Sequence, residues 1–200
     1  MSANLTRALI LVDVQNDFCE GGSLAVAGGA EVARRISAHV LGHADEYAAI
    51  VASADWHDDP GAHLPERPDY VSSWPAHCRM GTDAGSLPPG RRVCLGIRRG
   101  DLPQAQHETA YCRFEDFTRQ RDGRVALGDW LRYRAIEQVD VIGIATDHCV
   151  EATALGAVEE GFETIMLLDL TAGVGCQTTD AALAAMRAAE IELVGEPLLS

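Results

Sequence analysis

The chain has 200 residues and a mass of 21.4 kDa, the size of one domain with a full hydrophobic core. Hydrophobic residues make up 47% of it and charged residues 23%, which excludes a disordered chain. The formal net charge of -14 excludes sequence-independent nucleic-acid binding and disfavours an anionic membrane surface. We therefore expect residues 1–200 to form a single domain.

Short apolar runs with the character of buried strands recur along the chain. They are residues 8–12, 48–53, 92–97, 139–144, 164–168 and 191–194. Apolar stripes at helical spacing lie between them: Val32, Ile36 and Val40, with Ala33 and Leu41 beside them; Val150, Ala154, Ala157 and Val158, ended by Gly161; and Leu183 and Met186, after a Thr178-Thr179-Asp180 cap signal. This alternation predicts an α/β fold whose parallel sheet is covered on both faces.

The stretch from Asp55 to Gly90 is rich in Pro, Gly, His and Asp and has no periodicity, which is typical of a functional segment. The first residues show no signal-peptide pattern, and no segment approaches the roughly 20 apolar residues of a membrane span. The six cysteines are scattered without a Cys-x-x-Cys pair. We therefore expect free thiols and a soluble, cytoplasmic protein.

Ligands of open α/β folds bind beyond the carboxyl ends of the strands. Three predicted strands end in residues that can carry chemistry: Asp13, then Asp55-Trp-His57, then Thr146-Asp-His-Cys149. We expect a carboxylate, a cluster of potential metal ligands and a thiol to converge at this edge of the sheet.

Asp55, His57, His63 and His77 form the potential metal cluster. Alternate residues at a strand end point the same way, and the turn at residues 59–61 can bring His63 back to the same place. Three imidazoles and one carboxylate suit Zn, Fe or Mn better than Ca or Mg. The alternatives are ordinary surface histidines, or a ligand role for Cys78.

Cys149 follows a buried strand and opens a predicted helix. Backbone N–H groups and the helix dipole at such a position favour a thiolate and can hold an oxyanion. The alternative is a small buried core residue. A dyad with the neighbouring His148 is the weaker idea, because adjacent helical residues do not face each other. Asp13 can be a general base if it lies beside Cys149, or otherwise a turn or capping residue.

These residues resemble the nicotinamidase/pyrazinamidase branch of the isochorismatase-like hydrolases, from near Ala8 to about Val194. The matching motifs, in order, are Asp13-Val-Gln-Asn-Asp-Phe18, Asp55-Trp-His-Asp-Asp-Pro-Gly-Ala-His63, Pro68-Asp-Tyr-Val-Ser-Ser-Trp-Pro-Ala-His-Cys78, Ala110-Tyr111 with Phe114-Glu115, Val141-Ile-Gly-Ile-Ala-Thr-Asp-His-Cys-Val150 and Asp169-Leu-Thr-Ala-Gly173.

The resemblance implies a single isochorismatase-like domain, a three-layer α/β sandwich with a mainly parallel six-stranded sheet. It implies a metal-dependent cysteine amidohydrolase that converts nicotinamide, or a close aromatic carboxamide, to nicotinate and ammonia through a thioester. The implied partner is a small aromatic amide, with no nucleic acid and no membrane, and a homo-oligomer is compatible with the sequence.

The resemblance also implies roles for individual residues. One divalent transition metal (Zn, Fe or Mn) is held by Asp55, His57, His63 and His77. Cys149 is the nucleophile and Asp13 its base. The oxyanion hole comes from the backbone N–H groups of Ala145 and Cys149, with a cis peptide near Ile144-Ala145. An aromatic pocket for a pyridine ring comes from Phe18, Trp74 and Tyr111.

The sequence departs from this family at the third catalytic position. The family has a lysine there, usually followed by glycine, whereas all sixteen basic residues of this chain are arginine. Aligning Ile97-Arg-Arg-Gly100 puts Arg99 at that position, and a different gap puts Gln104 there. Arginine keeps the positive charge but is bulkier and does not readily give up a proton.

Four functions follow from these residues. The first is hydrolysis of nicotinamide or a close analogue, and the second is hydrolysis of another small amide in a specialised pathway. The third is a non-catalytic relative that binds a pyridine-like ligand, which the intact Asp13 and Cys149 disfavour. The fourth is an isochorismate-type vinyl-ether hydrolase, in which Cys149 would have no role.

Overall fold

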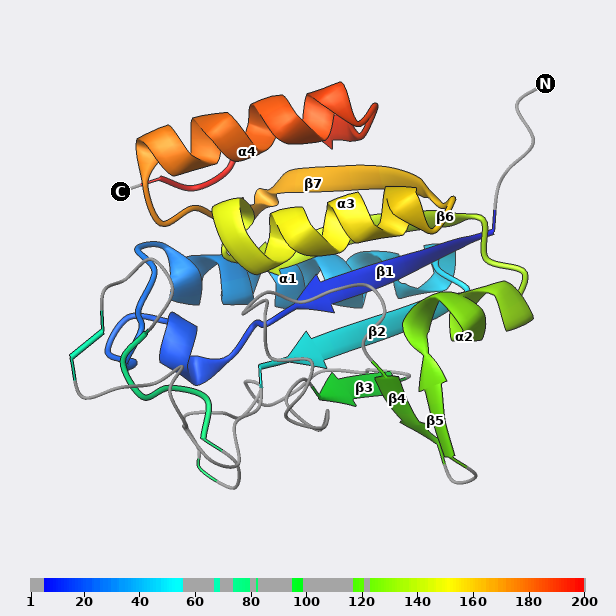
Figure 1. The fold of residues 1–200 in the computed structure, drawn as a ribbon, viewed down its shortest axis with the longest axis horizontal. Coiled ribbons are helices and arrows are strands. Elements are labelled where there is room, and N and C mark those ends of the chain that lie inside the picture. The colour runs from blue at the N-terminus through cyan, green and yellow to red at the C-terminus, as the bar shows by residue number, and fades with distance from the viewer. Residues whose placement is uncertain are drawn as a thin grey trace.

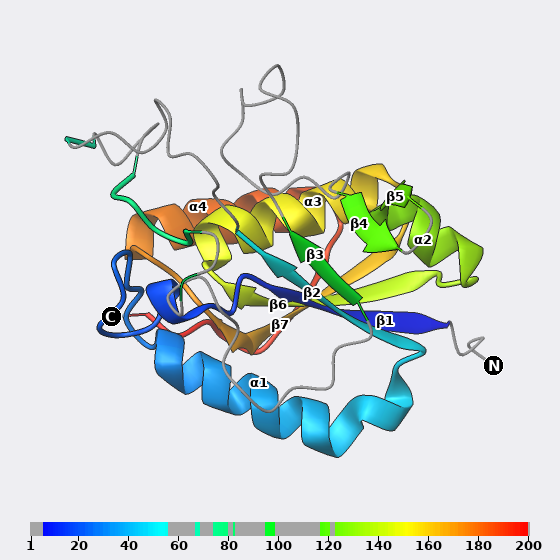
Figure 2. The ribbon, with the colours of Figure 1, turned by 90° about the horizontal axis from the view of Figure 1, so that it is seen from below.

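The computed structural model describes residues 6–55, 67–68, 74–79, 82, 95–98, 117–120 and 123–199. Over these ranges the chain forms one eight-stranded sheet between two layers of helices (Figure 1 and Figure 2). The predicted α/β sandwich with a mainly parallel sheet is confirmed. Among the helices of these same ranges, none is long and apolar enough to cross a membrane.

The sheet has the strand order β5-β4-β3-β2-β1-β6-β7-β8. Its parallel strands are β1 (Arg7–Val12), β2 (Ala49–Ala54), β3 (Leu95–Arg98), β6 (Gln138–Ile144), β7 (Glu163–Ala172) and β8 (Glu192–Val194). The antiparallel strands β4 (Phe117–Gln120) and β5 (Gly123–Ala126) extend one edge. The sheet was expected to have six strands, and the described ranges contain six parallel strands. The antiparallel pair β4–β5 raises the number of strands in this sheet to eight.

Helices cover the two faces of the sheet unequally. Figure 2 shows α1 (Gly29–His43) on one face and α3 (Glu151–Glu159) and α4 (Cys176–Ala188) on the other, with α2 (Leu127–Tyr133) beside them. Alternate residues of β1 serve the two layers, because successive side chains of a strand point to opposite faces. Leu9 and Leu11 join the cluster under α1, while Ile10 and Val12 join the cluster under α2, α3 and α4.

Helix α1 forms where the apolar stripe predicts it. Val32, Ile36 and Val40 are buried against the sheet, but Leu41 is 80% exposed, so its expected place beside the stripe is wrong. The helix begins after Gly28, which has a φ of 83° that suits glycine. The carboxylate of Glu20 accepts the N–H groups of Gly28 and Ala30 and so satisfies the start of the helix.

Helix α4 begins earlier than its sequence signal predicts. Its first residue is Cys176, so Thr178-Thr179-Asp180 lies within the helix and does not precede it. Asp147, from another part of the chain, binds the backbone just before this helix.

Strand β6 approaches β1 very closely at its carboxyl end. Gly143 pairs with Val12 and has a φ of 137°. A Cβ atom at residue 143 would lie 2.0 Å from the carbonyl oxygen of Val12, well inside contact distance. Only glycine fits here, and the next two residues of the chain lead into the candidate site.

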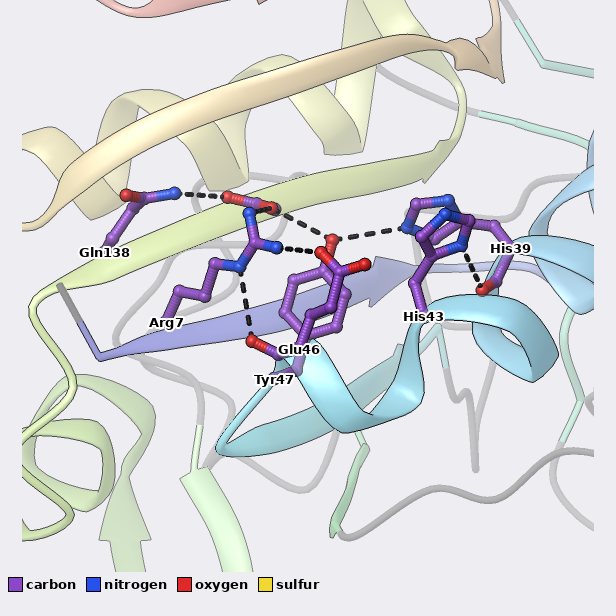
Figure 3. A network of polar contacts seen from close by, with 7 residues as sticks. Arg7, His39, His43, Glu46, Tyr47 and Gln138 are labelled. Carbon is purple, nitrogen blue, oxygen red and sulfur yellow. Dashed lines mark hydrogen bonds and ion pairs between the residues drawn. The ribbon is translucent and has the colours of Figure 1, made fainter. Parts of the chain in front are cut away.

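A buried carboxylate lies near the amino ends of β1 and β6 (Figure 3). Asp140 is 2% exposed; it accepts hydrogen bonds from Tyr47 Oη at 3.0 Å and Gln138 Nε2 at 2.8 Å, and pairs with Arg7 at 3.6 Å. Tyr47 Oη also contacts His39 Nε2 at 3.2 Å. These contacts satisfy the buried charge at the end of the sheet opposite the strand ends where ligands bind.

Candidate active site

A cavity of about 100 Å³ lies beyond the carboxyl ends of β2 and β6. Its walls join groups that the sequence places far apart. They include Asp55, His77, Ala145 and Cys149, the aromatic rings of Phe18 and Trp74, and apolar atoms of Val26, Ile144 and Val174. Two of the four predicted metal ligands, Asp55 and His77, and the predicted thiol of Cys149 therefore meet at this edge.

Asp13 is the first residue after β1 and is fully buried. Its φ of 49° turns the chain out of the strand. Its N–H donates to the Ser53 carbonyl at 3.3 Å, and its Oδ1 accepts the Ser53 hydroxyl at 2.9 Å. Because Val12 pairs with Gly143, Asp13 lies next to the strand end that leads to Cys149.

Asp55 and His77 form a close pair although 22 positions separate them. His77 Nε2 lies 2.9 Å from Asp55 Oδ2, and the other ring nitrogen, Nδ1, lies 2.7 Å from the carbonyl oxygen of Pro75. A carbonyl oxygen can only accept, so Nδ1 carries the proton. A neutral His77 therefore directs the lone pair of Nε2 toward the carboxylate.

This arrangement fits a metal ion. Two lone pairs face each other favourably only with a proton or a cation between them. The 2.9 Å separation of His77 Nε2 and Asp55 Oδ2 places an imidazole nitrogen and a carboxylate oxygen side by side. Imidazole nitrogen and carboxylate oxygen are also donors that divalent transition metals accept. The described residues alone hold no group of three or more potential ligands; His57 and His63 lie outside them.

The electrostatics of His77 reflect the same pair. Burial by itself lowers the pKa of His77, but the hydrogen bond and charge of Asp55 outweigh it, with help from the Pro75 carbonyl and Asp17. The net result is a pKa of His77 above its ordinary value.

Cys149 lies in the wide helical turn η5 (Thr146–Val150), two residues before α3 begins. The predicted helix start is therefore slightly displaced, and Cys149 belongs to the turn that precedes the helix. The turn follows a cis peptide bond between Ile144 and Ala145, as the resemblance implies. Ala145 and Cys149 both face the cavity, and the Cys149 side chain is partly exposed there.

Aromatic rings enclose the space between the thiol and the Asp55–His77 pair. The rings of Phe18 and His77 are 5.8 Å apart and tilted, and Trp74 meets His148 edge-on at 5.6 Å. Burial lowers the pKa of His148, and this effect outweighs the charge of Asp147, which raises it. The His148 ring is therefore neutral near pH 7. The two aromatic rings and the side chains of Val26, Ile144 and Val174 give the cavity a mainly apolar wall.

Cys78 does not have the features of a metal ligand. Its thiol is fully buried, and burial raises its pKa, an effect that the charges of Asp55 and Asp17 increase. Cys78 is also not among the residues that line the cavity, whereas Asp55 and His77 are.

Several predicted site residues lie outside the described part of the chain. They are His57, His63, Arg99, its alternative Gln104, and Tyr111. Their roles stay predictions.

Sequence reasoning missed three polar residues that organise the site. Gln15 and Asp17 are buried and bind the backbone at Asp55 and Cys78, and Asp147 binds the backbone at Val174. The alternate spacing of Asp13, Gln15 and Asp17 is a signal that could have drawn attention to the first two. No local signal identifies the partner of Asp147.

Comparison with known proteins bears on the fold and the site together. Residues 123–195 match the family model described as Isochorismatase domain. The "Nicotinamidase/pyrazinamidase" of Mycobacterium tuberculosis is 50% identical over 188 residues, covering 94% of this chain and 98% of that protein. Among solved structures, the pyrazinamidase of Pyrococcus horikoshii in complex with zinc has a TM-score of 0.76 and 30% identity, covering 94% of this chain and 98% of that one. A protein of L. infantum in complex with nicotinate has a TM-score of 0.77 and 28% identity, covering 99% and 98%.

The parallel sheet between two helical layers, with a cavity at its carboxyl edge, thus places the molecule in the class of isochorismatase-like α/β proteins. The chain belongs to the isochorismatase family, and its resemblance to the nicotinamidase/pyrazinamidase branch is confirmed.

Proposed function

We propose that this chain hydrolyses the carboxamide of nicotinamide, or of a close aromatic analogue, to the carboxylate and ammonia. The observation that carries the proposal is that the proposed nucleophile, two proposed metal ligands and the aromatic rings all line the same cavity. A cysteine on a strand-to-helix turn, a carboxylate–imidazole pair and two aromatic rings line one cavity. The 50% identity with a protein named nicotinamidase/pyrazinamidase supports the same reaction.

Cys149 and Asp13 perform the bond changes in this proposal. The carboxylate of Asp13 accepts the thiol proton of Cys149, and the thiolate attacks the carboxamide carbon. The C–N bond then breaks, and Asp13 returns the proton to the departing ammonia. Water next attacks the thioester, which releases the carboxylate product and restores the thiol.

The backbone and the aromatic rings orient the substrate. The N–H groups of Ala145 and Cys149 donate to the carbonyl oxygen as negative charge develops on it. Phe18 and Trp74 enclose the ring, with Tyr111 as a further proposed contact, and exclude water from the reacting carbon.

Asp55, His57, His63 and His77 are the proposed ligands of one divalent transition metal, Zn, Fe or Mn. When bound, the metal would act as a Lewis acid toward the lone pair on the ring nitrogen of a pyridine substrate. The zinc in the structure of the pyrazinamidase of P. horikoshii supports a bound metal in this chain, and the adjacent imidazole nitrogen of His77 and carboxylate oxygen of Asp55 suit one.

One sequence feature favours a second candidate, a small amide that carries an acidic group. The chain has no lysine, and Arg99 is the proposed substitute at the third catalytic position. A guanidinium can grip a carboxylate with two parallel hydrogen bonds, which a lysine cannot do. In the simpler view, Arg99 only supplies the positive charge that favours the thiolate.

An ammonia-release assay tests these functions. Purified, metal-loaded protein is mixed with nicotinamide, pyrazinamide and amides that bear a carboxylate, and ammonia and the acid product are measured. Fastest turnover of nicotinamide supports the first function, and fastest turnover of an acidic amide, lost in Arg99→Lys, supports the second. Binding of nicotinamide by calorimetry without ammonia release from any amide would overturn both.

A further inference from the structure

The segment that follows β1 carries three polar side chains at alternate positions, and each binds a different part of the site. Asp13 binds Ser53, Gln15 binds the backbone of Asp55, and Asp17 binds the backbone of Cys78. We propose that Gln15 and Asp17 are positioning residues that set the metal ligands Asp55 and His77 against each other. The inference rests on the proposed metal site and adds to it the two residues that hold its geometry.

Gln15 fixes the backbone on both sides of Asp55. The N–H of Asp55 donates to Gln15 Oε1 at 2.7 Å, and Gln15 Nε2 donates to the Asp55 carbonyl at 2.9 Å. Gln15 is fully buried, so no water competes for these bonds. Because both peptide groups of Asp55 are held by one planar amide, the direction in which its carboxylate leaves the chain is fixed.

Asp17 performs the equivalent task for His77. Its Oδ2 accepts the N–H of Cys78 at 2.6 Å, and its Oδ1 accepts the N–H and the hydroxyl of Ser23 at 3.2 and 2.9 Å. Cys78 has a φ of 48°, a left-handed conformation that residues other than glycine rarely adopt. A charge-assisted bond at this point holds the backbone immediately after His77 in place.

Neither member of this pair belongs to a named strand of the described residues. Asp55 lies just past the end of β2, and His77 lies in a segment that the sheet does not include. Residues 15 and 17, which follow the proposed base Asp13, supply contacts that connect them to the rest of the site. One five-residue segment therefore aligns the metal ligands with the reacting groups.

The experiment compares metal binding to Gln15→Met, Asp17→Asn and the natural protein. Metal-free protein is titrated with Co²⁺, followed by visible absorption, and Zn²⁺ affinity is obtained by competition. Outer contacts of metal ligands are worth about 10- to 100-fold in affinity, so each variant should weaken binding by that factor and alter the Co²⁺ spectrum.

Asp140→Asn is the matched control. It makes the same chemical change as Asp17→Asn, at a carboxylate that is equally buried but lies at the other end of the sheet. It should lower stability and leave both the Co²⁺ affinity and the spectrum unchanged. Ser23→Ala is the milder companion, since Ser23 is exposed and donates to Asp17; it should weaken Co²⁺ binding by a smaller factor even if Asp17→Asn fails to fold.

The outcomes separate the inference from the proposed function. If the natural protein binds Co²⁺ and Zn²⁺ but the Gln15, Asp17 and Ser23 variants bind them equally well, the positioning role is wrong and the metal site stands. If the natural protein binds neither metal, both the metal site and the positioning role are overturned.

Discussion

The carboxylate of Asp147 accepts the backbone N–H of Val174 at 2.9 Å, across 27 positions of sequence. The same carboxylate accepts the N–H of Gly175 at 3.3 Å and the hydroxyl of Thr178. Asp147 precedes Cys149 by two residues, and Val174 forms part of the cavity wall. This one side chain therefore joins the turn that carries the proposed nucleophile to the start of α4.

Asp147→Ala should destabilise the fold by about 2–4 kcal/mol, because it removes several hydrogen bonds to a charged group. Urea unfolding at pH 7 measures the loss. Asp129→Ala is the control, since that carboxylate is 71% exposed and its pair with Arg132 should contribute less than about 1 kcal/mol. Equal effects of the two substitutions would contradict the joining role of Asp147.

The contribution of Asp147 should also depend on pH. Burial by itself raises the pKa of Asp147, but the bonds from Thr178 and Val174 and the nearby His148 outweigh it, so the pKa is below its ordinary value. A carboxyl group whose pKa is lowered by folding stabilises the fold at pH values above its unfolded pKa of about 3.9. This stabilisation is lost as the pH falls through the pKa of the folded state. The difference in unfolding free energy between the natural protein and Asp147→Ala should therefore shrink below about pH 4.

His77→Ala should abolish or strongly weaken binding of a transition metal, since it removes one of the proposed ligands. Elemental analysis after purification and dialysis gives the metal content per chain. Affinity in the natural protein should also fall as pH is lowered, because metals bind the neutral imidazole. His43→Ala is the control: His43 is exposed at the end of α1, and its Nδ1 contacts its own helix at the His39 carbonyl. Equal metal content in both variants would count against the site.

Cys149→Ala should reduce ammonia release from nicotinamide by more than about a thousandfold while metal content stays the same. Cys176→Ala, at an exposed thiol on the first turn of α4, should leave the rate unchanged. A limiting amount of iodoacetamide should label Cys149 before the other described cysteines, as read by mass spectrometry, and Cys78 last because it is buried. Comparable turnover in Cys149→Ala would overturn the covalent mechanism.

Gly143→Ala should destabilise the fold by about 3 kcal/mol and impair turnover, because a methyl group would enter the β1–β6 contact at Val12. Thermal unfolding and the ammonia assay measure the two effects. Gly42→Ala, in α1, offers the opposite case. A Cβ there meets no atom within 4 Å, so alanine should be neutral or slightly stabilising. A Gly143→Ala protein as stable as Gly42→Ala would show that the sheet relaxes at this point.

Tyr47→Phe should cost about 1–3 kcal/mol of stability, because Asp140 loses a buried donor, while KM for nicotinamide stays unchanged. The site of the substitution, at the amino ends of the strands, is remote from the cavity. Tyr133→Phe, at a ring that is 87% exposed, should have no measurable effect on either quantity. A changed KM in Tyr47→Phe would show that the two ends of the sheet are coupled.

Much of the fold follows from the sequence because burial leaves a periodic pattern. The apolar run at β1 and the stripe of Val32, Ile36 and Val40 report which residues face the core, and the structure buries them. The pattern fails where an element is short or polar. β4 and β5 have four residues each, include arginine and pair locally at the sheet edge, so they leave no apolar run to detect.

The sequence also determined which residue types stand at the strand ends. Asp13, Asp55 and Cys149 could be singled out because they follow predicted buried strands, and His77 because it lies with two other histidines in the aperiodic segment of residues 55–90. Their spacing along the chain indicated a metal cluster and a thiol. In a parallel sheet the carboxyl ends of the strands lie at the same edge, independently of the loops that connect them.

Only the tertiary structure decided how these groups are held. Gln15 binds Asp55 across 40 positions, Asp17 binds Cys78 across 61, and Asp147 binds Val174 across 27. In each case a side chain binds backbone groups: every residue offers a C=O, and every residue except proline offers an N–H. The sequence therefore carries no mark of the partner, and the choice is made by which backbone groups folding leaves buried and in need of a hydrogen bond.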